Sequence, residues 1–407
     1  MKVVRSIQDV PSDQNVYVFG AGSGGRIALA ALRASGRRVS AVIDSVKTGT
    51  IDDLEILSPE AFGALNLPDA PVLVASQYWA PILDTLYQNG HRSVFNAYPF
   101  VLENAHLLNG SWALPSAPSL PGGEDEPTPT EFWSDFNVAQ HRAFATAEES
   151  LAHLEWRNSI YIYYSDLMPT SGMDGKVVLD YGCGPGLDLV GFAVNSRPSR
   201  LIAADISPVA LSEARHRVAL HGVEIEWTQI NPENVRLPFE DASIDLIHSS
   251  GVLHHTPDPI AIMREFKRIL KPGGQAQIMV YNRNSIFVHL YVAYLQMLKE
   301  DHFKGFTLEQ AFQRLTDGPN CPISECYTLS TFIDMARQAG LRAEFTGSAI
   351  SVMELDWLAQ RNAALLDPRL PRESRQFLYS LTFDSRGCPL HNNTVAGIDA
   401  CFRLTAL

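Results

Sequence analysis

A strand that runs directly into a glycine-rich loop and then into a helix constrains this chain more than any other feature. Residues 177–181 are apolar apart from one acid, glycines stand at positions 182, 184 and 186, and residues 187–192 continue in a helical pattern. Glycine lets the backbone approach a ligand closely, and the free N–H groups at a helix start attract a carboxylate or a phosphate. The pattern predicts a strand–loop–helix unit of an α/β fold that binds a nucleotide-like ligand.

A second strand strengthens this prediction. Residues 201–205 form an apolar run that ends in Asp205. An acid about 20 residues after the glycine loop is placed where a doubly wound sheet accepts hydrogen bonds from a ribose diol. The alternative is that Asp205 only caps the helix that follows.

Together with three later segments, these residues resemble class I S-adenosylmethionine-dependent methyltransferases. Residues 179–186 are similar to the first motif of that family, and segments 237–245, 250–258 and 270–274 follow in the family's order. The resemblance covers roughly residues 176–281 and is nearest to the small-molecule enzymes akin to the ubiquinone and menaquinone methyltransferases. It implies a doubly wound sheet closed by an antiparallel hairpin, and methyl transfer from S-adenosylmethionine to a small-molecule acceptor.

The resemblance also implies a set of cofactor-binding residues. The glycine loop would surround the methionine end, Asp205 would hold the ribose, and Ile206 would lie against the adenine. The full set is Asp180, Gly182, Cys183, Gly184, Gly186, Asp205, Ile206, Glu233, Asn234 and Ser250. The family often has an acid followed by alanine before the segment that starts at residue 237, whereas this chain has Asn231–Arg236, so the residue that meets the adenine amine stays open.

The chemistry itself sets few demands on the protein. The sulfonium is already a strong electrophile, so the protein aligns donor and acceptor and excludes water, and we expect no metal. A hydroxyl or amine acceptor would give its proton to a base. The candidates are His254, His255 and Tyr281, at the edge of the sheet where α/β folds bind ligands. The alternative is that at least one of the paired histidines serves packing or hydrogen bonding.

Two insertions, at about 282–328 and 351–396, are expected to form the acceptor side. Weaker candidates in the first insertion are Arg283, Asp317 and Tyr327. Aromatic residues at helical spacing between positions 287 and 295 favour a buried helix face.

A metal site built from the cysteines of these insertions is disfavoured by spacing. The four residues in question are Cys321, Cys326, Cys388 and His391. Their spacings do not match a zinc site, which favours free buried cysteines.

The first hundred residues carry a second glycine motif. Gly20, Gly22 and Gly25 follow a strand and open a helix, and Asp44 ends the next strand, so the motif has the context of a nucleotide-binding loop. We expect strands at 16–19, 39–43, 72–75 and 93–95, fewer than a full dinucleotide fold has. The segment resembles the Rossmann-like accessory domains found beside sugar-modifying transferases, in which the loop either holds a nucleotide-type ligand or only supports the fold.

Size and charge complete the prediction. The 407 residues exceed one ordinary core, so we expect a Rossmann-like α/β domain at 1–104, a proline-rich linker at 105–135 and a methyltransferase domain at 136–407. The net charge of −13 argues against nucleic acid as a partner. No segment suggests a signal peptide or a membrane span, which favours a cytoplasmic protein, and a homodimer stays open.

Two other functions compete with methyl transfer. The first is an NAD-dependent oxidoreductase that acts through the first domain, which is disfavoured because Ile82, not lysine, stands four residues after Tyr78. The second is a protein that binds S-adenosylmethionine without catalysis, since Asp180, the glycine loop and Asp205 establish cofactor binding alone.

Overall fold

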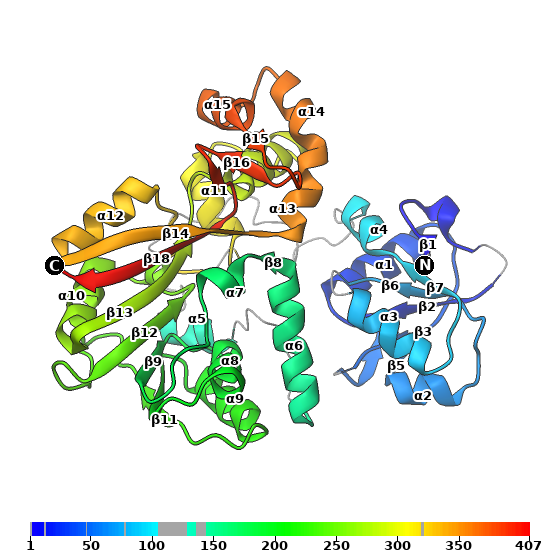
Figure 1. Cartoon of the computed structure of the whole chain (residues 1–407). Helices are drawn as coiled ribbons and strands as arrows, with labels where there is room; N and C mark the ends of the chain where they lie inside the picture. The colour runs from blue at the N-terminus through cyan, green and yellow to red at the C-terminus, as the bar shows by residue number, and fades with distance from the viewer. Residues whose placement is uncertain are drawn as a thin grey trace. The chain divides into compact units, whose positions relative to one another are not determined.

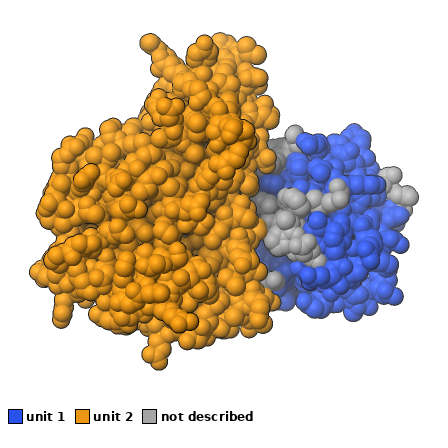
Figure 2. Space-filling view, in the orientation of Figure 1, with its two compact units in different colours: residues 1–118 blue, residues 119–407 orange. Residues whose placement is uncertain are grey.

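The computed structural model describes residues 2–11, 14–45, 47–76, 79–104, 128–135, 144–318 and 321–407. The chain divides into two compact units, Met1–Pro118 and Ser119–Leu407 (Figure 2). Most of the expected linker lies outside the described residues. Its last part, Pro129–Asp135, differs from the expectation, because it forms helix α5 with Phe132 buried.

Unit 1 is a seven-stranded sheet with the order β1-β7-β6-β2-β3-β5-β4. Its elements in chain order are β1 (Lys2–Val3), η1 (Ile7–Asp9), β2 (Val16–Phe19), α1 (Ser23–Ala34), β3 (Val39–Ile43), β4 (Gly49–Ile51), β5 (Leu54–Leu57), α2 (Pro59–Ala64), β6 (Val72–Val74), α3 (Trp79–Gln88), β7 (Val94–Asn96) and α4 (Tyr98–Glu103).

The expected strand count of unit 1 is corrected. The four expected strands are present as β2, β3, β6 and β7, and β1, β4 and β5 are added. Strand β4 pairs with β5 as an antiparallel hairpin, and the two-residue β1 pairs with β7, so each addition is too short to show a period in the sequence. Numbered among themselves, the parallel strands β5, β3, β2, β6 and β7 lie in the order 3-2-1-4-5 of doubly wound sheets.

Unit 2 is built on an eight-stranded sheet with the order β11-β10-β9-β12-β13-β18-β14-β8. The first half of the unit comprises α5, α6 (Ala147–Ile160), β8 (Tyr161–Ile162), α7 (Tyr164–Leu167), β9 (Val177–Tyr181), α8 (Leu187–Asn195), β10 (Arg200–Asp205), α9 (Pro208–Ala219), β11 (Glu226–Gln229), β12 (Ile244–Ser250), η3 (Leu253–His255), α10 (Pro259–Ile269) and β13 (Leu270–Tyr281). The second half comprises η4 (Phe287–Lys299), α11 (Leu308–Leu315), α12 (Leu329–Gln338), β14 (Leu341–Ser351), α13 (Val352–Trp357), η5 (Leu358–Gln360), α14 (Arg361–Leu366), α15 (Arg372–Ser380), β15 (Thr382–Phe383), β16 (Pro389–His391), β17 (Thr394–Val395) and β18 (Asp399–Ala406).

The topology of this sheet confirms the expected fold class. Strands β11, β10, β9, β12 and β13 are parallel, and the strand order reverses between β9 and β12. Strand β18 is antiparallel to both β13 and β14, which gives the expected closing hairpin (Figure 1). Ligands of such sheets bind beyond the carboxyl ends of the strands at the point of reversal, here after β9 and β12.

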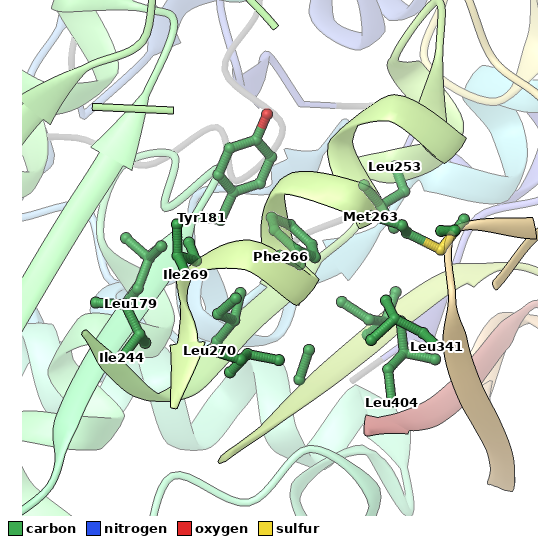
Figure 3. Close-up of a cluster of buried hydrophobic side chains, with 14 of the residues drawn as sticks. Leu179, Tyr181, Ile244, Leu253, Met263, Phe266, Ile269, Leu270, Leu341 and Leu404 are labelled. Carbon is green, nitrogen blue, oxygen red and sulfur yellow. The ribbon is translucent and has the colours of Figure 1, made fainter. Parts of the chain in front are cut away.

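Two apolar layers hold the helices on the sheet. One face packs against α10 and α12 through a cluster that includes Leu179, Phe266 and Leu404 (Figure 3). The other face packs against α6, α8 and α9 through Leu154, Val178 and Phe192, among others. The strands are therefore fixed from both sides, and the loops at their carboxyl ends start from rigid positions.

The segment that leads into the sheet forms two helices, α6 and α7. Helix α6 ends at Ile160, because Ile162 pairs with Ile350 of β14 and Tyr163 takes a left-handed conformation with φ of 71°. The short helix α7 then begins at Tyr164. This break turns α7 back toward the sheet and brings Tyr164 beside β12.

The two insertions pack on each other at the same end of unit 2 (Figure 1). The first holds η4, a helix with π-type hydrogen bonding, and α11; the second holds α13 to α15 and the small sheet β15–β17. Leu290 and Tyr294 of η4 are buried against Phe377 of α15 in one apolar cluster. The other two aromatic residues of the stripe, Phe287 and Tyr291, are half-buried, so the stripe is a partly buried helix face. Within the described parts of the chain, no helix combines the length and the apolar character that a membrane span requires.

Candidate functional site

The glycine loop after β9 has the conformation that its sequence predicts. Gly182, Gly184 and Gly186 have φ values of 73°, 51° and 84°, which side chains rarely tolerate. A Cβ atom on Gly182 would lie 2.2 Å from Val252 Cγ2, whereas one on Gly184 would meet nothing within 4 Å. Gly182 is thus required for packing against the segment after β12, while the surface at Gly184 is open to a ligand.

Asp205, the last residue of β10, links the end of that strand to the glycine loop after β9. Its carboxylate accepts hydrogen bonds from Gly184 N–H and from Ser207 N–H, each at 2.8 Å. The cap of α9 is Ser207, whose hydroxyl accepts from Ala210 N–H, so Asp205 is not the helix cap. Burial raises the pKa of Asp205 above its ordinary value, although the backbone hydrogen bonds oppose that shift.

Asp180 presents a buried oxygen with an unmet hydrogen bond. The residue is 2% exposed, and among the described residues its Oδ2 has no hydrogen-bond partner. Burial raises its pKa to about 7. A buried carboxylate oxygen normally has a donor, and the ammonium group of a methionine moiety would supply one, so Asp180 fits the cofactor that the resemblance implies.

The other implied cofactor residues are less closely grouped. Ser250 Oγ, at the end of β12, lies 2.6 Å from the Tyr164 hydroxyl oxygen, and Cys183 is buried in the glycine loop. Ile206 is half-buried, whereas Glu233 and Asn234 are exposed in a turn after β11. The side chain of Asn234 accepts from Arg236 N–H within that turn. Contact of Glu233 or Asn234 with an adenine therefore stays a prediction.

A buried charged cluster beside Asp180 was not predicted from the sequence. Asp188, in the first turn of α8, forms an ion pair with Arg157 of α6 and accepts from the Tyr164 hydroxyl at 2.9 Å. His248 Nε2 lies 3.1 Å from the same carboxylate. Burial raises the pKa of Asp188, but Arg157 and His248 outweigh that effect and hold its pKa well below the usual range. The contacts of Asp188 with Arg157, Tyr164 and His248 therefore join α6, α7 and β12 to the start of α8.

The cluster lies next to a cavity of about 250 Å³. Its lining includes Arg157, Tyr164 and Asp188 together with polar side chains of the following segment, such as Thr170 and Asn195. No sequence motif indicates this cluster, because Arg157 lies in α6 and belongs to no pattern that includes the glycine loop.

The paired histidines have different environments. The Nδ1 atom of His254 accepts a hydrogen bond of 3.2 Å from Tyr281 N–H, and its ring stacks on the Tyr281 ring at 3.7 Å. A neutral ring in this arrangement carries its proton on Nε2, which has no partner among the described residues. Burial holds the pKa of His254 well below its ordinary value. In this geometry the Nε2–H of His254 is a hydrogen-bond donor and the ring packs on Tyr281, so the role of His254 as a base stays a prediction.

His255 and Tyr281 meet at Asp317 of the first insertion. The Tyr281 hydroxyl donates to Asp317 Oδ1 at 3.2 Å, and the Ser324 hydroxyl donates to Oδ2 at 3.2 Å. His255 Nε2 lies 3.5 Å from Oδ2, while its Nδ1 lies 2.6 Å from the carbonyl oxygen of Ile323. Burial raises the pKa of Asp317, partly offset by His255. The structure thus brings together a phenol, an imidazole and a carboxylate from three separate segments.

Arg283 and Tyr327 have structural contacts. Arg283 forms ion pairs with Glu309 of the first insertion, at 2.6 Å, and with Glu373 of the second, at 3.1 Å. Tyr327 packs against the core cluster beneath α12. The guanidinium of Arg283 therefore joins the two insertions.

The glycine loop of unit 1 shows the same construction as the loop of unit 2. Gly20 has φ of 115°, and a Cβ atom on Gly25 would lie 1.7 Å from the Gly20 carbonyl oxygen. Asp44 accepts from Ala21 N–H at 2.7 Å and from Lys47 N–H at 2.9 Å. Asp44 thus fixes its loop as Asp205 does in unit 2. Tyr78, the residue weighed for an oxidoreductase, lies outside the described residues.

Asp399, at the start of β18, leads to a pH-dependent prediction. Its backbone pairs with Tyr281, its side chain is buried, and burial raises its pKa from 3.8 to about 7, with Arg157 opposing. The folded protein then binds the proton more tightly than the unfolded chain, so the stability present below about pH 4 decreases as the pH rises through about 7. Asp399→Asn removes this penalty. At about pH 8 we expect the variant to be more stable than the parent by up to about 4 kcal/mol.

The measurement is thermal unfolding of both proteins at about pH 5 and about pH 8. Asp334→Asn, at an exposed position of α12, serves as the control. A stability difference that is the same at both pH values would contradict the assignment of the shift to Asp399.

Comparisons with known proteins address the same segment. A family model described as "Methyltransferase domain" matches residues 179–278. The chain is 32% identical over 145 residues to a protein of Pseudomonas paraeruginosa named "Ubiquinone biosynthesis O-methyltransferase", which covers 33% of this chain and 61% of that relative. It is 42% identical over 103 residues to an uncharacterized 37.1 kDa protein of a Streptomyces fradiae transposon, covering 25% of this chain and 29% of the relative. The matches thus span less than two thirds of these relatives.

Among solved structures, the chain is similar to a protein of Thermotoga maritima described as an S-adenosylmethionine-dependent methyltransferase, a possible histamine N-methyltransferase. The TM-score is 0.38 at 16% identity, over 68% of this chain and 99% of that chain. The matched segment 179–278 runs from β9 into β13 and contains the glycine loop, Asp205 and the paired histidines. Residues 179–278 of unit 2 therefore match a methyltransferase domain, and they lie in a doubly wound sheet that an antiparallel hairpin closes.

Proposed function

We propose that the protein transfers the methyl group of S-adenosylmethionine to a hydroxyl group of a small molecule. The observation that carries the proposal is the arrangement of the loop after β9. There, the surface at Gly184 is open, Asp205 holds the loop at the end of the next strand, and the buried Oδ2 of Asp180 has no hydrogen-bond partner among the residues that the structure describes. The methionine end of the cofactor would lie at Asp180 and its ribose at Asp205. Bound S-adenosylmethionine supplies the electrophilic methyl group.

The acceptor side provides a path for the proton. As the acceptor oxygen bonds to the methyl carbon, the carbon–sulfur bond breaks, its electron pair stays on sulfur, and the acceptor hydroxyl loses its proton. The Tyr281 hydroxyl already donates to Asp317 Oδ1, so it can accept the acceptor proton as it passes its own proton to the carboxylate. The raised pKa of Asp317 supports this role, because a buried carboxylate takes up a proton readily.

Unit 1 bears on the class of acceptor. The doubly wound strand order of unit 1 and the Asp44–Ala21 hydrogen bond support a nucleotide-type ligand there. With such a ligand in unit 1, a nucleotide-linked sugar is one candidate acceptor, and a small hydroxylated metabolite is the other. We favour these acceptors over nucleic acid because the chain carries a net charge of −13.

Calorimetric titration with S-adenosylmethionine, and separately with NAD, tests the cofactor. We expect saturable heat with S-adenosylmethionine and, as a competitor of it, with S-adenosylhomocysteine. Heat with NAD and none with S-adenosylmethionine would instead support an oxidoreductase that acts through unit 1. Binding of S-adenosylmethionine without turnover in a screen of nucleotide sugars and hydroxylated metabolites would favour the non-catalytic reading.

Replacing Tyr281 by phenylalanine tests the proton path. With an acceptor found by that screen, Tyr281→Phe should lower kcat by about 10²–10⁴-fold, because the acceptor proton loses its route to Asp317. The affinity for S-adenosylmethionine should be unchanged. Tyr327→Phe, in a neighbouring tyrosine that packs on the core, is the matched control. Equal kcat in both variants would rule out Tyr281 as the group that receives the proton.

A further inference from the structure

Next to the proton path, three side chains with metal-binding atoms gather from two segments. His255 belongs to the short helix η3 after β12, and Asp317 and Cys321 belong to the loop after α11. One donor atom from each of the three lies within 4.8 Å of the others. We propose that these residues bind a divalent transition-metal ion, with zinc as the first candidate. This deepens the proposed function, because Asp317 also receives the Tyr281 hydroxyl.

The histidine is held as a metal ligand usually is. A short contact of 2.6 Å joins His255 Nδ1 to the Ile323 carbonyl oxygen, so Nδ1 carries the proton and donates. Its Nε2 then presents a lone pair, and it faces Asp317 Oδ2 at 3.5 Å. Two acceptor atoms face each other at a distance that suits a shared cation. Ligating histidines characteristically donate their other N–H to a carbonyl or carboxylate, which fixes the ring.

The carboxylate is held in a similar way. The Ser324 hydroxyl donates to Asp317 Oδ2, and the Tyr281 hydroxyl donates to Oδ1. Oδ2 faces His255 Nε2, and the Tyr281 hydroxyl lies within hydrogen-bond distance of both carboxylate oxygens, 3.2 Å from Oδ1 and 3.3 Å from Oδ2. When Oδ2 binds an ion, Oδ1 stays available to the Tyr281 hydroxyl. Asp317 is 4% exposed, a depth at which an anionic side chain needs a compensating charge.

The third donor decides the kind of metal. Cys321 is fully buried, and its Sγ lies 3.9 Å from His255 Nδ1 and 3.3 Å from the Ile323 carbonyl oxygen. A thiolate together with an imidazole favours zinc over magnesium or calcium, which prefer oxygen ligands. One carboxylate and one thiolate balance the charge of a divalent ion. With three protein ligands, a tetrahedral ion keeps its fourth position for the acceptor oxygen, as catalytic zinc sites do.

This cluster was not visible in the sequence. The spacing of the cysteines disfavours a site made from Cys321, Cys326, Cys388 and His391, and the structure supports a different set. His255 is drawn in from the motif after β12, far from Cys321 along the chain. The ion would lower the pKa of an acceptor hydroxyl at its open position, and Tyr281 would then carry the proton away.

The test uses the full chain, freed of any histidine tag and stripped with a chelator. After reloading with zinc and gel filtration, we expect about one zinc per chain by elemental analysis. Reloading with cobalt should give the near-ultraviolet thiolate-to-cobalt charge-transfer band and the visible bands of a tetrahedral ion. Cys321→Ser should lose the charge-transfer band, and Asp317→Asn should weaken cobalt binding at least about tenfold. Cys326→Ser, in the same segment but outside the cluster, should keep the charge-transfer band and the parent's affinity for cobalt.

Two outcomes would overturn the proposal. The first is a stripped and reloaded protein that holds no metal, and the second is a charge-transfer band that persists in Cys321→Ser or disappears in Cys326→Ser. Circular dichroism of each variant shows whether it is folded, and the two different ligand variants guard against a single misfolded one. S-adenosylmethionine titration of the metal-free protein separates the questions, since binding of the methyl donor there leaves the proposed function standing even when the metal site fails.

Discussion

Asp188→Asn should destabilise the protein by about 3–5 kcal/mol, the usual cost of removing one partner from a buried ion pair. The substitution keeps the shape of the side chain but leaves the Arg157 guanidinium without a counter-charge, and it weakens the hold on His248. The affected contacts connect α6, α7, α8 and β12. The loss is measured by denaturant unfolding followed by tryptophan fluorescence, to which Trp156 of α6 contributes.

The control for this variant is Asp166→Asn. Asp166 lines the same cavity but is exposed, so its replacement should change the stability by less than about 0.5 kcal/mol. A second variant, Arg157→Met, should restore part of the stability when it is combined with Asp188→Asn, because the double change removes the uncompensated charge. An Asp188→Asn protein within about 1 kcal/mol of the parent would contradict the assignment of a tightly coupled pair.

Asp205→Ala should lower the affinity for S-adenosylmethionine by at least about 100-fold, or about 2.7 kcal/mol. The variant loses the acceptor for the ribose diol, and Gly184 N–H loses the partner that orders the loop. Asp205→Asn should have a smaller effect, since the amide oxygen still accepts one hydrogen bond. Calorimetry of the parent and both variants measures the difference.

Asp241→Ala is the control for the cofactor experiment, because Asp241 is exposed at the turn before β12, where it pairs with Arg268. It should bind S-adenosylmethionine as the parent does. If Asp205→Ala bound the cofactor with the parent's affinity, the ribose would have to lie elsewhere, and the placement of the cofactor across the glycine loop would be wrong.

The parts of the site that could be predicted are local in sequence. Gly182 to Gly186 form a single tight turn between a strand and a helix, and Asp205 ends the next strand. The backbone conformation at these positions therefore follows from the neighbouring residues in the sequence. The cluster around Asp188 could not be predicted in this way. Its partners Arg157 and His248 lie 31 and 60 residues away, and each has an ordinary place in its own helix or strand.

The histidine pair shows a second limit of sequence reasoning. His254 and His255 are neighbours with the same chemistry, yet a backbone N–H occupies a nitrogen of one ring and a carbonyl oxygen binds a nitrogen of the other. These opposite partners come from β13 and from the first insertion. Roles that depend on such partners follow only from the assembled fold. The short strands β1, β4 and β5 are a simpler case, because segments of two to four residues show no reliable period.

The ion pairs of Arg283 have a consequence for engineering the acceptor specificity. The Arg283 guanidinium forms ion pairs with Glu309 of the first insertion and with Glu373 of the second. If either segment were replaced, one of these ion pairs would be lost. Because Arg283 itself belongs to the first insertion, a chimera that receives only one segment from a related protein would either lose this arginine or set a foreign surface against it. Both segments together form the smallest unit that could be exchanged between relatives as a module.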